Sequence, residues 1–229
     1  MSANANPTNA APMKKYMRDK FPYLGIKTPE RTVLFKQFLA DNGLPPVDEV
    51  EAIVLTLWDL PEREYHYLAV SLLDRMQKKL PPPSAQLMEQ LITTKSWWDT
   101  VDTLAGGIVG SHFQRYPEIK AQFLPKWRQS DNLWLRRTTI LFQLGYKTNT
   151  DTGLLFDIIC ENLGSTEFFI NKAIGWALRE YSKTDKTAVL TFVSQTDLAP
   201  LSRREALKWL KNKGHLDAVP LFLCNENLR

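Results

Sequence analysis

Two tryptophans and two aspartates lie within six residues of each other, in the segment KSWWDTVD at residues 95–102. Trp98 and Asp102 are four residues apart, so they share one face if the segment is helical. An indole ring attracts a cation, and a carboxylate beside it can stabilise positive charge or hold a water molecule. The pair therefore fits a cationic ligand or a cationic transition state, although a Trp-Trp pair in a helical protein more often belongs to the core.

The distribution of charge favours an anionic partner. The chain has 229 residues, of which 44% are apolar and 24% charged, as in ordinary globular proteins. Its net charge is +4 and its pI is near 9.0. Residues 126–215 hold 14 Lys and Arg against 9 Asp and Glu, so the rest of the chain is near neutral. A basic half indicates nucleic acid as the leading candidate; a merely solvated surface is the alternative.

Several classes of protein and site are disfavoured. Cys160 and Cys224 lack metal-ligand spacing and the three histidines lie far apart, so we expect no metal, no other cofactor and a reducing, cytoplasmic setting. No apolar run reaches the roughly 18 residues needed to span a bilayer. Residues 1–12 are polar and lack the features of a signal peptide. We expect them to be a disordered lead-in to a single domain at residues 13–229.

Helical periodicity dominates the chain. Apolar residues recur at the i, i+3, i+4 spacing of amphipathic helices. This spacing predicts helices over residues 49–57, 65–76, 86–92, 133–144, 154–163, 168–181 and 205–210. Breakers such as the Pro81–Pro83 run and Gly164 separate them, and strand-type alternation is absent. The sequence therefore predicts an all-α protein with short loops.

A weak internal repeat emerges when the second helix of each expected helix pair is aligned. Taking Ala69, Thr103, Thr138, Ala173 and Ala206 as markers gives steps of 34, 35, 35 and 33 residues. This regularity is typical of helical-repeat solenoids in the HEAT or TPR size class.

The residues directly before these markers should line one surface of the solenoid. They are Leu68, Asp102, Arg137, Lys172 and Glu205. Asp102, Arg137 and Lys172 should then be near neighbours, about 10 Å apart per repeat. A carboxylate beside two cations on a concave basic face has the character of a binding site, and such a groove can hold a phosphate backbone.

Six long segments together carry a family resemblance. They are YMRDKFPYLGIKTPER, LWDLPEREY, KSWWDTVD, SDNLWLRRTTILFQL, STEFFINKAIGWALREY and LAPLSRREALKWLK, and they run in order from about Lys14 to Lys213. This set resembles the AlkD-type DNA alkylation repair proteins. The resemblance implies a HEAT-like solenoid whose concave basic face holds duplex DNA. It also implies a monofunctional glycosylase that removes cationic N3- and N7-alkylpurines without flipping the base.

The resemblance further implies roles for single residues. The catalytic carboxylate falls on Asp102, its flanking aromatic residues on Trp98 and Trp176, and its paired arginine on Arg137. The residues expected to contact DNA are Tyr16, Thr28, Arg137, Lys172 and Arg179. Among them, Arg137 is expected to clamp a phosphate beside the lesion. The expected partner is duplex DNA with alkylated bases, bound by a monomer.

The chemistry implied by this family suits these residue types. An alkylated, cationic purine is already a good leaving group, so its release needs no general acid. The transition state places positive charge on the sugar, as in other glycosyl hydrolyses. Asp102 would stabilise that charge and position a water molecule.

Alternatives stay open at the level of the sequence. Trp176 lies in an apolar helix and would by default be a core residue, and Arg137 follows Arg136 and would be a solvated helix residue. A non-catalytic DNA-structure-binding protein on the same scaffold is the second functional hypothesis, and a protein-interaction scaffold is the third. The combination of Trp98, Asp102 and Arg137 favours the glycosylase.

Overall fold

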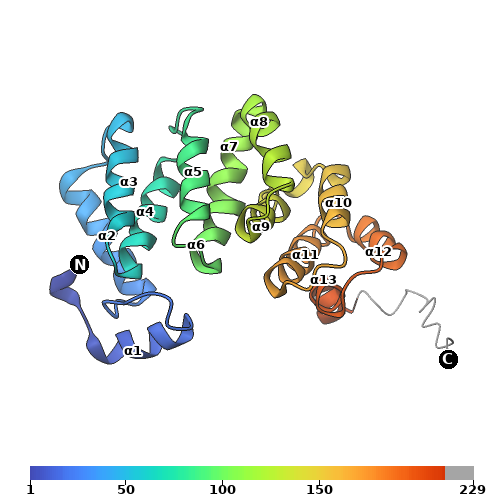
Figure 1. Ribbon diagram of the computed structural model, residues 1–229, viewed down its shortest axis with the longest axis horizontal. Helices are drawn as coiled ribbons and strands as arrows, with labels where there is room; N and C mark the ends of the chain where they lie inside the picture. Colours follow the sequence, from blue (N-terminus) through green and yellow to red (C-terminus); the bar gives the residue numbers. More distant parts are fainter. Residues whose placement is uncertain (215–229) are drawn as a thin grey trace.

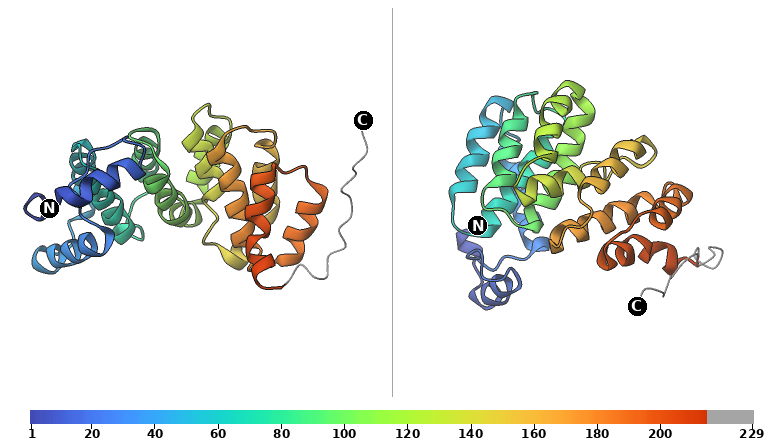
Figure 2. Two further views of the ribbon diagram at one scale, coloured as in Figure 1. Left: turned by 90° about the horizontal axis from the view of Figure 1, so that it is seen from below. Right: turned by 45° about the vertical axis from the view of Figure 1, so that its right-hand side comes forward.

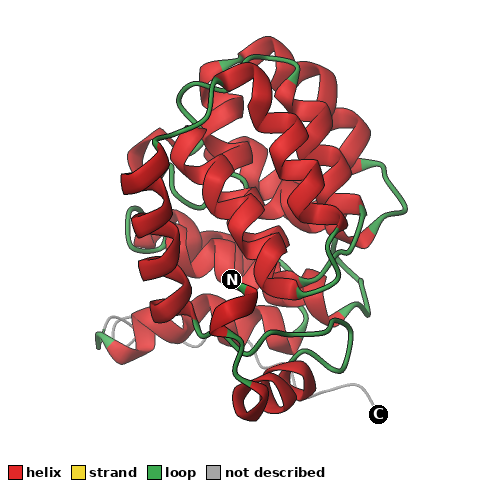
Figure 3. Cartoon of the chain, turned by 90° about the vertical axis from the view of Figure 1, so that its left-hand side faces the viewer, coloured by secondary structure: helices red, strands yellow, loops and turns green. Residues whose placement is uncertain are grey.

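Helices arranged in successive pairs form most of the described chain. The computed structural model describes residues 1–214. Figure 1 shows the pairs following one another along the long axis of the molecule. Figure 3 shows helices and loops without a strand in this part of the chain. The prediction of an all-α helical-repeat solenoid is confirmed.

An N-terminal unit precedes the helix pairs. It consists of η1 (Ser2–Asn4), α1 (Pro7–Tyr16) and α2 (Thr28–Asn42). The pairs that follow are η2 (Val47–Glu49) and α3 (Val50–Asp59) with α4 (Arg63–Met76); α5 (Ser84–Thr93) with α6 (Trp98–Thr103), η3 (Leu104–Val109) and α7 (Gly110–Arg115); α8 (Pro117–Arg128) with α9 (Leu133–Leu141); η4 (Lys147–Asn149) and α10 (Thr152–Glu161) with α11 (Phe168–Tyr181); and α12 (Lys186–Gln195) with α13 (Pro200–Asn212).

The second helices of the pairs form one continuous row, as the repeat predicts. Helix α4 contacts α6, α6 contacts α9, α9 contacts α11, and α11 contacts α13. A single hydrophobic cluster runs through the pairs from Val50 to Ala206. Figure 2 shows the row from two further directions. Because equivalent positions of successive repeats lie side by side, residues about 35 apart in sequence meet on one surface.

The second pair contains an irregular helix that positions α6. Helix α6 runs into the π-helical stretch η3, and π-helical turns are frequent at functional sites. Gly106 in η3 and Gly110 at the start of α7 allow the turn that follows α9 to come close. A Cβ atom on Gly106 would lie 3.3 Å from the Leu144 Cβ, and one on Gly110 would lie 2.3 Å from the Phe142 carbonyl oxygen. This approach fixes the helix carrying Asp102 against the next repeat.

Replacing Gly110 with alanine is expected to lower the free energy of unfolding by about 1–3 kcal/mol, because the new methyl group overlaps a backbone oxygen that cannot rotate away. Gly107 is the matched control, since a Cβ there has only the Asp74 Oδ1 atom at 3.9 Å. Gly107→Ala should be neutral or stabilising by up to about 1 kcal/mol. Urea unfolding of both variants measures the difference, and equal stabilities would contradict this account of the contact.

The N-terminal residues differ from the expected disordered lead-in, because they form helices tied to the repeats. The Asn6 N–H donates to the Leu24 carbonyl oxygen at 2.7 Å. The buried Glu64 carboxylate accepts backbone N–H groups of Leu24, Gly25 and Ile26 at 2.8–3.1 Å. Gly25 has a φ of 87°, and a Cβ on it would lie 2.0 Å from the Asn6 carbonyl oxygen. No local pattern in the sequence predicts these contacts.

No helix within residues 1–214 is long and apolar enough to cross a membrane.

Candidate functional site

A groove of about 490 Å³ lies between the row of second helices and the N-terminal segment. Its lining combines aromatic and charged side chains. The aromatic members are Tyr16, Trp97, Trp98, Phe168, Phe169 and Trp176, and the charged members are Arg18, Asp102, Arg137, Lys172, Arg179 and Glu205. The groove therefore brings together all the site residues predicted from the sequence except Thr28.

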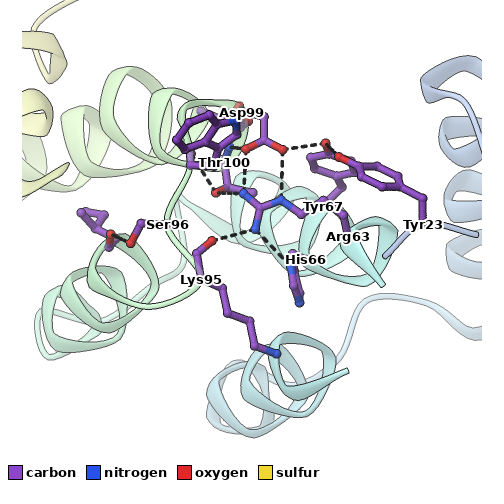
Figure 4. Close-up of polar contacts among 11 residues, drawn as sticks. Tyr23, Arg63, His66, Tyr67, Lys95, Ser96, Asp99 and Thr100 are labelled. Atoms are coloured by element: carbon purple, nitrogen blue, oxygen red, sulfur yellow. Dashed lines mark hydrogen bonds and ion pairs between the residues drawn. The ribbon is translucent and has the colours of Figure 1, made fainter. Parts of the chain in front are cut away.

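A buried arginine holds the start of α6 in place (Figure 4). The Arg63 guanidinium donates to both carboxylate oxygens of Asp99, at 2.6 and 3.0 Å, and to the Lys95 carbonyl oxygen at 2.8 Å. Tyr67 also donates to Asp99, at 2.6 Å. The Lys95 ammonium in turn donates to three carbonyl oxygens at the end of α3. These bonds fix the residues on both sides of Trp98, so Asp99 serves the fold and leaves Asp102 as the carboxylate in the groove.

Asp102 forms a two-pronged ion pair with Arg137 of the next repeat. Arg137 Nε donates to Asp102 Oδ1 at 2.7 Å, and Nη2 donates to Oδ2 at 2.8 Å. The third nitrogen, Nη1, donates to the Phe169 carbonyl oxygen. Arg137 is buried, whereas Asp102 keeps 14% of its side chain exposed to the groove. The geometry fixes the plane of the carboxylate and leaves its outer edge accessible.

Burial raises the pKa of the Asp102 carboxyl above its ordinary value. The hydrogen bonds and the positive charge of Arg137 lower that pKa, and the nearby negative charge of Asp99 raises it. Desolvation is the largest contribution, because it disfavours the charged form of a carboxyl group. Asp102 is thus a partly desolvated carboxylate, which strengthens its interaction with any positive charge that enters the groove.

Three aromatic residues, Tyr16, Trp98 and Trp176, line the groove together with Asp102. The Tyr16 ring meets the Trp98 ring edge-on, with ring centroids 6.2 Å apart. Tyr16 is 73% exposed, so most of its side chain is accessible. Trp176 is half-buried on α11. The neighbouring Trp97 is buried beneath the groove against Trp134 and Phe169, as expected for a core residue.

One glutamate pairs with both cations of α11. Glu205 on α13 accepts hydrogen bonds from the Lys172 Nζ and the Arg179 Nη1 atoms, each at 2.8 Å. Gly175 allows the two helices to approach, since a Cβ there would lie 2.5 Å from the Glu205 Cβ. The repeat alignment placed Glu205 in the same register as Asp102, but the sequence did not single it out as a site residue. Arg18, Phe168 and Phe169 were likewise not predicted.

Thr28 lies outside this groove, in a neighbouring cavity of about 580 Å³. Tyr16 and Trp98 line both cavities, so this aromatic pair forms the wall between them. Thr28 is the exposed first residue of α2, and its hydroxyl accepts a hydrogen bond from Arg31 at 3.2 Å.

Comparison with known proteins identifies the family of the chain. The family model described as DNA alkylation repair enzyme matches residues 1–210. The chain belongs to the DNA alkylation repair enzyme family. The fold also matches a solved structure named "Predicted DNA alkylation repair enzyme from Enterococcus faecalis", with a TM-score of 0.83 and 32% identity over 90% of this chain and 96% of that chain. A search of curated proteins finds no match.

Membership of the DNA alkylation repair enzyme family implies DNA as a partner of the protein. Within residues 1–214, no three His, Cys, Asp or Glu side chains gather in a way that could hold a metal ion. The groove therefore offers carboxylates, cations and aromatic rings as its chemical groups.

Proposed function

We propose that the protein is a monofunctional DNA glycosylase that hydrolyses the N-glycosidic bond of cationic alkylated purines, namely N7-alkylguanine and N3-alkyladenine, in duplex DNA. The observation that carries the proposal is the desolvated Asp102 carboxylate, held by Arg137 and bordered by Trp98, Trp176 and the exposed Tyr16. An anion beside aromatic faces suits a cationic nucleotide.

Asp102 supplies the chemistry in this proposal. As the bond between the base and the sugar breaks, positive charge develops on the deoxyribose. The carboxylate stabilises that charge, and its free edge accepts a hydrogen bond from the attacking water. The positive charge of the alkylated base makes it a leaving group without protonation. The mechanism therefore requires no general acid at the leaving group.

Arg137 acts as a positioning residue in this proposal, in place of the phosphate clamp expected from the sequence. Each of its three nitrogens already donates to Asp102 or Phe169, and its side chain is buried. Because Arg137 is only 3% exposed, a phosphate has little access to it. The phosphate contacts fall instead to the partly exposed Lys172 and Arg179, which are 39% and 26% exposed.

The composition of the groove supports catalysis on a stacked base. Among the described residues, no asparagine or glutamine lines the groove. Its uncharged polar groups are the hydroxyl of Tyr16 and the indole N–H groups of Trp97, Trp98 and Trp176, and its other polar side chains are charged. Enzymes that flip a base read its edge with hydrogen bonds inside a pocket. Because most polar groups of this groove are charged, it is suited to select a base by its charge, so we infer that the lesion stays in the helix.

Wild-type protein is expected to release free base from duplex DNA containing N7-methylguanine, well above the spontaneous rate. A duplex containing a neutral lesion such as 1,N6-ethenoadenine should release none, because its base lacks the positive charge. Chromatography of the released bases measures both rates. Tight, salt-sensitive DNA binding without release from N7-methylguanine or N3-methyladenine would contradict the glycosylase and favour a non-catalytic DNA-binding protein.

A further inference from the structure

A groove that binds DNA and accepts a cationic base faces conflicting electrostatic demands. Phosphates require positive charge, whereas a cationic lesion is repelled by it. The charged lining contains four cations, Arg18, Arg137, Lys172 and Arg179, and two carboxylates, Asp102 and Glu205. The two carboxylates bind three of these four cations, so the charges near the tryptophans are largely paired.

Glu205 is placed to neutralise the cations closest to Trp176. Lys172, Trp176 and Arg179 are four and three residues apart on α11, so they form one stripe on the helix that faces the groove. Glu205 bonds the two cations on either side of the tryptophan. The hydrogen bond from Lys172 lowers the pKa of the Glu205 carboxyl, which keeps it ionised.

We propose that Glu205 is a specificity-determining residue. This proposal rests on the glycosylase function proposed above. By pairing with Lys172 and Arg179, it reduces their repulsion of a cationic base at Trp176 and Asp102. The groove then binds a charged alkylated base in preference to a neutral base of the same shape. The same pairing weakens attraction to undamaged DNA, so specificity arises as a difference between two affinities.

Equilibrium binding to two duplexes tests this role without relying on catalysis. One duplex carries N7-methyl-2′-fluoro-2′-deoxyguanosine, which is cationic and slow to lose its base. The other carries 7-deaza-7-methyl-2′-deoxyguanosine, a neutral nucleotide of the same shape. The readout is the ratio of the two dissociation constants, because general damage to the fold weakens both complexes alike.

Wild-type protein should prefer the cationic duplex, and Glu205→Gln should reduce that preference by about three- to tenfold, the effect of one unit charge at close range in a partly screened groove. The variant should also bind undamaged DNA more tightly. Glu161→Gln is the control, because Glu161 also pairs with a cation of another helix, Arg128, but does not line the groove. It should leave the ratio unchanged.

Lys172→Met provides an independent test if Glu205→Gln does not fold. This partly exposed lysine can be removed with little cost to packing, and its loss should raise the preference for the cationic duplex. An unchanged ratio in Glu205→Gln, a lower ratio in Lys172→Met, or no preference in the wild type would overturn the role of Glu205. The glycosylase proposal is decided separately by base release from N7-methylguanine DNA, because the binding experiment does not depend on base release.

Discussion

Replacing Asp102 with asparagine is expected to reduce base release from N7-methylguanine DNA by about 10²–10³-fold, the usual effect of removing a group that stabilises transition-state charge. The amide keeps the shape of the side chain and can still accept one hydrogen bond from Arg137. It carries no negative charge to stabilise the sugar cation. DNA binding should persist, because Lys172 and Arg179, the cations that we propose contact phosphates, are unchanged. Single-turnover assays with saturating enzyme measure the chemical step.

Asp99→Asn is the matched control for Asp102→Asn. Asp99 lies on the same helix and also forms a two-pronged pair with a buried arginine, Arg63. It lines the neighbouring cavity and not the groove that contains Asp102. Both variants should lose stability, but only Asp102→Asn should lose base release at a temperature where both are folded. Equal losses of activity would show that the ion pairs matter only for the fold.

The register of the repeat was the most informative feature of the sequence. Steps of 33–35 residues placed Asp102 beside Arg137, and the two side chains are in direct contact. Lys172 was expected beside them, and it lines the same groove while pairing with Glu205 one repeat further on. In a solenoid, a position in the sequence translates directly into a place on the surface, so even a degenerate repeat predicts neighbours.

Some helices were not predicted because they lack an apolar stripe. Helix α2 contains no buried residue, so its sequence carries no core-facing pattern. Helix α8 contains Pro125, which normally breaks a helix. Helix α12 buries only Val189 and Val193. Periodicity detects a helix through the face that it buries, and these helices bury little or are interrupted.

Long-range ion pairs explain what the sequence did not reveal about the site. The partner of Asp99 is Arg63, 36 residues earlier, and no local motif joins the two. The burial of Arg137 also depends on Phe169 of the next repeat, whose carbonyl oxygen binds its third nitrogen. From the sequence alone, Arg137 was expected both to pair with Asp102 and to clamp a phosphate beside the lesion. Its assignment as a positioning residue required the packing of three successive helices.

The ion pairs between helices also indicate how the solenoid combines stability with function. Three ion pairs each join adjacent helices in the row of second helices: Arg63 with Asp99, Arg137 with Asp102, and Glu205 with Lys172. The first pair is nearly enclosed, with side chains 0% and 6% exposed, and anchors α6. The later pairs open onto the groove. The same type of contact therefore becomes a candidate site where one partner keeps an exposed edge.

Replacing Arg137 with methionine is expected to shift the acid limb of the rate–pH profile for base release to higher pH. Base release requires ionised Asp102, so activity falls as pH drops through the pKa of this carboxyl. Burial already raises that pKa, and Arg137 lowers it through its hydrogen bonds and its charge. Removing Arg137 leaves burial and the negative charge of Asp99, which both raise it. The pKa must therefore rise, and a larger fraction of Asp102 is protonated at a given mildly acidic pH.

The variant should also lose about 3 kcal/mol of unfolding free energy, because one member of a buried pair is left without its partner. Arg137→Lys keeps the charge but not the two-pronged geometry, so its acid limb should lie between those of the wild type and Arg137→Met. Arg136→Met is the matched control, since Arg136 is the adjacent arginine and does not line the groove. The remaining charged groups around Asp102 are the same in all variants, namely Arg18, Asp99, Lys172, Arg179 and Glu205. Rate–pH profiles at saturating enzyme give the result: coincident acid limbs for Arg137→Met and the wild type would show that Arg137 does not set the ionisation of Asp102.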